Sequence, residues 1–176
     1  MSALYPYLVS SLPMLHFRMK LPFSFEEFLL RCEGCIPERD CALLRALPKP
    51  QAYAEGSQRH SAIAAWVDFD TALRNSLVRV RAPRRHREAA SYLRPDGYQG
   101  LALEQVALAA QRSHSAMEGE QVLDQARWNM LEELSFGHYF DLDFLILYAY
   151  KLILLERWEK VHTADSVALL DAMLTP

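Results

Sequence analysis

The chain has 176 residues, a formal net charge of −3 and a pI near 6.1. Hydrophobic residues make up 51% and charged residues 23%, which is ordinary for a folded protein and argues against an intrinsically disordered chain. The acidic balance excludes a globally basic nucleic-acid-binding protein, so any basic surface has to be local. The length suits one domain.

The N-terminal sequence YPYLVSSLPML predicts an extended segment, with a short strand as an alternative, that packs against helices. It is rich in aromatic and β-forming residues, but Pro6 and Pro13 interrupt it. The start has no basic region and no convincing cleavage site, so it is a poor signal peptide. With three cysteines and no export signal, we expect a cytoplasmic, reduced chain.

Two short helices are predicted next. Ser24 and Glu27 form a capping-box pattern that begins a helix ending near Gly34. Pro37 suits the first turn of a second helix, over residues 38–47. The sequence PKPQAYAEGS, residues 48–57, predicts a linker.

Apolar residues at steps of three and four predict a long helix over residues 60–82, which Pro83 ends. Asp70 and Arg74 lie four residues apart on it and can form an ion pair. A short helix over residues 84–93 and a turn at residues 95–97 follow.

The C-terminal half predicts helices over residues 101–111 and 120–135, separated by a polar break. The segment HYFDLDFLILYAYKLILLERW, residues 138–158, predicts a central helix capped by Asp141 and buried on nearly all sides. It is too short and too interrupted by charge for a membrane span, which needs ~20 mostly apolar residues. A separate terminal helix begins at Thr163.

These elements predict an all-α fold, a single-domain bundle of about six to seven helices with an extended N-terminal segment. The domain is expected to span residues 1–176. Within it, residues 1–47 form an N-terminal segment and helical hairpin, residues 48–57 a linker, and residues 58–176 the main helical body.

Three clusters are candidate sites, and the first is Cys32, Cys35 and Cys41. Cys-x-x-Cys is half of a zinc-binding pattern, but no second pair completes the four ligands of a structural site. Cys32 and Cys41 also fall on apolar faces, where a free cysteine behaves as a small hydrophobic residue. Core cysteines are the favoured interpretation.

The second cluster surrounds one helix–turn–helix corner, and its members are Glu132, Glu133, His138, Asp141 and Asp143. Carboxylates beside a histidine can bind a metal or perform acid–base chemistry. A di-metal helical site needs Glu-x-x-His motifs from two helices, whereas Glu133 and His138 lie five residues apart. Roles at helix ends explain Asp141 and His138. We favour the helix-end roles.

The third cluster is a basic run with five arginines in nine residues: Arg79, Arg81, Arg84, Arg85 and Arg87, with His86 among them. It can be a solvated structural face, a contact for an acidic face of a partner protein, or a phosphate-binding site. Nucleic-acid modules couple such a run to a basic domain or stacking aromatic residues, which are missing here. We therefore expect no nucleic-acid partner.

No motif in the sequence indicates an enzyme. There is no phosphate-binding glycine-rich loop, no dinucleotide-binding glycine pattern and no nucleophile-elbow motif, and the chain has only six glycines. We expect no catalytic residues, no cofactor and no bound metal.

Several segments in order resemble one family: YPYLVSSLPML with PFSFEEFLLRC, WVDFDTALRNSLVRVRA, and RWNMLEELSFGHYFDLDFLILYAYKLILLERW. The chain is similar to the small proteins encoded within bacterial V/A-type ATP synthase operons. The similarity spans nearly the whole chain, and its specificity lies in the ordered set of segments.

This resemblance implies a non-catalytic subunit or assembly factor of a rotary ATPase. The favoured role is that of the all-helical connector, named C in archaeal enzymes and d in eukaryotic ones, which seats the central stalk on the rotor ring. The expected partners are other ATP synthase subunits at the inner membrane, with the basic run as the contact. The family supplies no catalytic motif to carry over.

Two alternative functions stay open. One is a nucleotide- or phosphate-sensing helical protein that uses Arg79 to Arg87, and the other is a metal-dependent enzyme around Glu133, His138 and Asp141.

Overall fold

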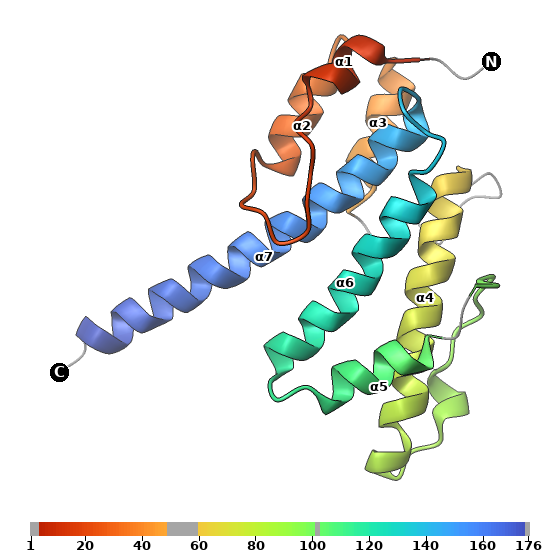
Figure 1. Cartoon of the computed structure of the whole chain (residues 1–176), viewed down its shortest axis with the longest axis vertical. Helices are drawn as coiled ribbons and strands as arrows, with labels where there is room; N and C mark the ends of the chain where they lie inside the picture. The colour runs from red at the N-terminus through yellow and green to blue at the C-terminus, as the bar shows by residue number, and fades with distance from the viewer. Residues whose placement is uncertain (1–3, 49–59, 101–102, 175–176) are drawn as a thin grey trace. The chain divides into compact units, whose positions relative to one another are not determined.

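A computed structural model describes residues 4–48, 60–100 and 103–174, with side chains through residue 164. The predicted all-α fold is confirmed, because these residues form seven α-helices and two short 3-10 helices and contain no strand (Figure 1). No helix among them is both apolar and long enough to cross a membrane.

The contacts divide the chain into two compact units. Unit 1 combines both ends of the chain, Met1–Ala52 and Gly137–Pro176, and unit 2 is Tyr53–Phe136. The sequence grouped residues 58–176 into one body, whereas the contacts group the last forty residues with the N-terminal segment. The single domain over residues 1–176 stays a prediction. All but the first residue of the predicted linker, 48–57, lies outside the described residues.

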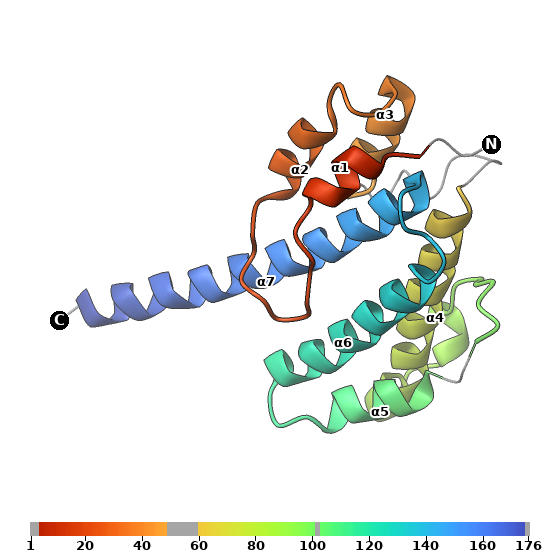
Figure 2. The ribbon, with the colours of Figure 1, turned by 45° about the horizontal axis from the view of Figure 1, so that its top comes forward.

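Unit 1 contains four helices: α1 (Pro6–Ser11), α2 (Phe25–Cys32), α3 (Glu38–Ala46) and α7 (Leu142–Leu174). Both α2 and α3 pack on α7, as Figure 2 shows. The predicted cap of α2 is confirmed, because the hydroxyl of Ser24 accepts a hydrogen bond of 3.1 Å from the backbone N–H of Glu27.

The prediction of an extended N-terminal segment is wrong for residues 6–11, which form α1. Pro6 occupies the first helical position, where the missing N–H costs nothing and the fixed φ favours a helix. Tyr5, just before it, donates a 2.7 Å hydrogen bond to the carboxylate of Asp40. Burial, together with this bond, raises the pKa of Tyr5 to about 12.

The prediction of a separate helix from Thr163 is also wrong, since α7 runs without a break from Leu142 to Leu174. The hydroxyl of Thr163 donates to the carbonyl of Glu159 within α7, at 2.8 Å, and so does not cap a new helix. Among the side chains of α7 that the structure describes, those up to residue 164, the buried ones lie between Leu145 and Leu155.

Phe28 lies at the centre of the contact between α2 and α7. It is completely buried, and its ring centroid lies 5.5 Å from that of Tyr148 and 6.3 Å from that of Phe25. The hydroxyl of Tyr148 donates to the carbonyl of Pro13 at 2.9 Å, so the segment between α1 and α2 is held against α7.

Unit 2 contains α4 (Ser61–Arg81), the 3-10 helices η2 (Pro83–Arg85) and η3 (Ala89–Tyr92), α5 (Glu104–Arg112) and α6 (Ala116–Leu134). The helices α4, α5 and α6 pack on one another (Figure 1). The predicted helix over residues 84–93 is replaced by the two 3-10 helices, because the residue between them that ends η2, His86, has a left-handed φ of 51°.

The helix α6 begins at Ala116, four residues earlier than the sequence predicted. Ser115 accepts a 3.1 Å bond from the N–H of Glu118, whose carboxylate accepts one from the N–H of His114 at 3.0 Å. Gly119 follows, and a Cβ there would lie 2.7 Å from the carbonyl oxygen of Ala110. The absence of a side chain at Gly119 therefore lets the backbones of α5 and α6 approach closely.

Polar contacts centred on Arg127 and on Asn75 help to hold unit 2 together internally. Arg127 on α6 bridges two carboxylates, with Nε 2.8 Å from Asp70 and Nη1 2.7 Å from Asp124. The predicted pair of Asp70 and Arg74 is also present, at 2.6 Å. Asn75 on α4 bonds both the N–H and the carbonyl of Arg94, at 3.0 and 2.7 Å. This amide fixes the chain after η3 against α4.

Candidate partner-binding site

An open groove of about 590 Å³ runs along the last turns of α4 in unit 2. Its floor is apolar and its rim is basic. The lining residues are Arg74, Leu77, Val78, Arg81, Ala82, Arg85, Arg87 and Tyr92.

The turn after α4 brings the arginines to this groove. Pro83 ends the α-helix and opens η2, and His86 then adopts the left-handed conformation. The N–H groups of Arg85 and Arg87 both donate to the carbonyl of Ala82, each at 3.0 Å. These two bonds fold the chain back, so that Arg85 and Arg87 line the same groove as Arg81 at the helix end.

The structure separates the predicted basic run into two sets. Arg81, Arg85 and Arg87 line the groove, whereas Arg79 and Arg84 do not. Sequence reasoning missed Arg74 and Tyr92 as members of the site. The seven-residue step from Arg74 to Arg81 is two helical turns, and this spacing was the signal that could have placed Arg74 on the same face.

The groove carries positive charge that nearby carboxylates do not neutralise. Arg74 is paired with Asp70 at 2.6 Å. Within the part of the chain that the structure describes, no carboxylate forms an ion pair with Arg81, Arg85 or Arg87, and all three are exposed. Three charged guanidinium groups therefore stand beside an apolar floor.

The cysteine cluster is divided between core and surface. Cys32 and Cys41 are buried, with the sulfur of Cys41 3.9 Å from the carbonyl oxygen of Cys32, and Cys35 is exposed. Burial raises the pKa of Cys32 to about 12 and also raises that of Cys41, which disfavours the thiolate that a zinc ion requires. The core interpretation is confirmed for Cys32 and Cys41.

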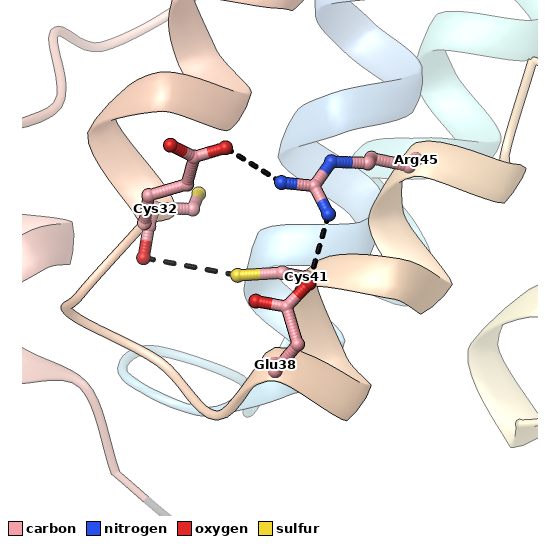
Figure 3. A network of polar contacts seen from close by, with 5 residues as sticks. Cys32, Glu38, Cys41 and Arg45 are labelled. Atoms are coloured by element: carbon pink, nitrogen blue, oxygen red, sulfur yellow. Dashed lines mark hydrogen bonds and ion pairs between the residues drawn. The ribbon is translucent and has the colours of Figure 1, made fainter.

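An ion-pair network lies beside these two cysteines, as Figure 3 shows. Arg45 on α3 reaches Glu33 at 2.6 Å and Glu38 at 3.0 Å. The guanidinium thus joins the end of α2 to the start of α3. The arrangement is structural, because it ties together the two helices of the hairpin.

At the start of α7, the ligand atoms of His138, Asp141 and Asp143 lie within 4.8 Å of one another. Glu132 and Glu133 do not belong to this group. Asp141 caps α7, since one oxygen accepts from the N–H of Phe144 at 3.0 Å and the other lies 2.6 Å from Nδ1 of His138. The predicted cap is confirmed, and His138 supports it.

This pair predicts a pH-dependent contribution to stability. The hydrogen bond with Asp141 raises the pKa of His138 against the opposing effect of burial. Burial raises the pKa of Asp141, but the bonds from His138 and Phe144 outweigh it and lower that pKa overall. The ionised pair therefore contributes fully between the ordinary aspartate pKa of about 3.9 and the ordinary histidine pKa of about 6.5. The contribution is lost as pH falls through the lowered pKa of Asp141 and as pH rises through the raised pKa of His138.

The measurement is urea unfolding of the native protein and of His138→Gln from pH 5 to 9. We expect the native protein to be more stable by a few tenths of a kcal/mol at pH 5.5, because the pair is partly exposed. The difference should shrink toward pH 9. A difference that grows with rising pH would contradict the assigned pair.

Comparison with known proteins finds one similarity. A family model described as "Protein of unknown function (DUF2764)" matches residues 85–170. The match begins within the arginine turn and continues into α7. Neither the curated proteins nor the solved structures gave a match to the chain.

Proposed function

We propose that this protein is a non-catalytic component of a bacterial V/A-type ATP synthase, a connector-like part of the stalk that acts through protein–protein contacts. The ordered segments that resemble the operon-encoded family support the assignment to this complex. The all-α fold fits a helical connector. On this proposal the protein is not itself an enzyme, and it reaches the inner membrane through the other subunits.

The observation that carries a role in partner binding is the arginine-rimmed groove. Arg81, Arg85 and Arg87 are exposed beside apolar side chains, and no ion pair within the described residues neutralises them. Complementary charge speeds and orients the encounter of two proteins, and apolar contact holds them together. A surface with both properties suits docking to an acidic face of another subunit.

Co-purification tests this proposal. The protein is expected to be recovered with the ATP synthase when membranes of the native host are solubilised under mild conditions. Changing Arg81, Arg85 and Arg87 to glutamate should reduce the recovered fraction on the order of tenfold, because it reverses the charge at the groove. Intact ATP synthase with no trace of the protein would refute the assignment.

A second candidate function is phosphate or nucleotide sensing. Three guanidinium groups and the exposed ring of Tyr92 share one groove, and arginine binds phosphate well. Calorimetry with ATP and with ADP separates the two functions. A sensor gives saturable heat with one of these nucleotides, whereas a connector gives none.

A further inference from the structure

We propose that the groove binds an acidic segment of a partner protein, in which an apolar side chain is flanked by aspartate or glutamate. This inference rests on the proposed function, because it names the chemistry of the partner at that site. Three features of the groove carry it: the floor, the backbone around the turn, and the division of the arginines.

The floor requires an apolar group on the ligand. Leu77 and Ala82 are each 8% exposed and Val78 is half-buried, so they form a shallow hydrophobic surface at the bottom of the groove. Tyr92 is 55% exposed at its edge. Apolar anchors surrounded by polar contacts dominate the affinity of protein interfaces. A simple anion would leave this floor in contact with water.

The backbone favours a carboxylate over a phosphate. Phosphate sites commonly use free N–H groups at the start of a helix, where the helix dipole is positive. This groove lies at the end of α4, where the dipole is negative. The N–H groups of Arg85 and Arg87 are already bonded to the carbonyl of Ala82. These two N–H groups are therefore not available to an anion, which leaves the arginine side chains as its main donors, and arginine forks match carboxylates in paired hydrogen bonds.

The arginines provide an internal control for the geometry. Arg81 and Arg85 line the groove, whereas Arg79 and Arg84 belong to the same basic run and lie outside it. Reversing either pair changes the net charge equally. A ligand that binds in the groove loses more affinity when Arg81 and Arg85 are reversed than when Arg79 and Arg84 are reversed. A ligand held only by the overall charge loses the same affinity in both cases.

The experiment measures the binding of labelled peptides to the full chain by fluorescence anisotropy. The probe is a helical peptide with leucines flanked by glutamates, and the control peptide has glutamine in place of every glutamate. We expect saturable binding of the acidic peptide alone. Arg81→Glu with Arg85→Glu should weaken it on the order of tenfold or more, and Arg79→Glu with Arg84→Glu by less than about threefold.

Tyr92→Ala tests the apolar contribution without altering charge, and should weaken the acidic peptide severalfold. Circular dichroism of each variant checks that the helices remain. Equal weakening of acidic-peptide binding by the two pairs of arginine substitutions would overturn the proposal. Equal binding of the glutamine peptide and the acidic peptide would overturn it as well. So would displacement of the acidic peptide by ATP from a site whose affinity Tyr92→Ala does not change.

The two proposals fail in different ways. If the protein co-purifies with the ATP synthase but does not bind the acidic peptide, the inferred ligand is wrong and the proposed function stands. If the acidic peptide binds and only the groove variants lose it, while no ATP synthase is recovered, the ligand class stands and the assignment to that complex is wrong.

Discussion

Replacing Arg127 with leucine is expected to lower the free energy of unfolding by about 3–5 kcal/mol. Asp124 has no exposed surface, and the guanidinium of Arg127 lies 2.7 Å from it. Burial alone would lower the pKa of Arg127, but the carboxylates of Asp70 and Asp124 outweigh that effect and raise it. Removing the guanidinium leaves the buried carboxylate of Asp124 without the positive charge that offsets its burial. The resulting loss of stability is larger than the contribution of an exposed ion pair.

Urea unfolding followed by tryptophan fluorescence measures the effect, since Trp66 and Trp128 both lie in unit 2. Arg74→Leu is the matched control. It also removes an arginine paired with Asp70, but that arginine is exposed, so the loss should stay below about 1 kcal/mol. Comparable losses in the two variants would show that burial does not govern this network. Replacing both Arg127 and Asp124 with leucine should recover much of the stability.

Replacing Phe28 with alanine is expected to cost about 3–5 kcal/mol, because it empties the contact between α2 and α7. The ring is completely buried and meets the rings of Phe25 and Tyr148. Both the lost apolar burial and the cavity left behind contribute to this cost. The substitution is also expected to loosen the segment between α1 and α2, which Tyr148 holds through a hydrogen bond to the carbonyl of Pro13.

Phe136→Ala is the control for this substitution, since Phe136 is 86% exposed and should change stability by less than about 0.5 kcal/mol. Urea unfolding measured by circular dichroism compares the two variants, and hydrogen exchange follows the amides of α2 and α7. Unchanged protection of these amides in Phe28→Ala would contradict the packing described for unit 1.

Most helices could be predicted because their signals are local. The steps between Ile63, Trp66 and Leu73 place one face of α4 in the core, and these side chains are buried. The caps at Ser24 and Asp141 depend on residues three positions away. The capping pattern at Ser115 and Glu118 was equally readable and moves the start of α6, but the sequence interpretation overlooked it.

The partners of buried polar groups could not be predicted in this way. Asp124 and Arg127 fall between apolar residues of α6, and nothing nearby in sequence indicates that Arg127 meets Asp70, 57 residues away. Hydrogen bonds donated by the hydroxyls of Tyr5 and Tyr148 likewise join residues 35 and 135 positions apart. Such pairs are set by how helices pack, which a local pattern does not encode.

For the candidate site, the sequence by itself determined that positive charge gathers over residues 79–87 and that a helix ends within them at Pro83. Only the tertiary structure decided which arginines share a groove. Two hydrogen bonds to the carbonyl of Ala82 fold Arg85 and Arg87 back toward Arg81, and the later η3 adds Tyr92. Charge is a property of composition, whereas the surface that displays it depends on where the chain turns.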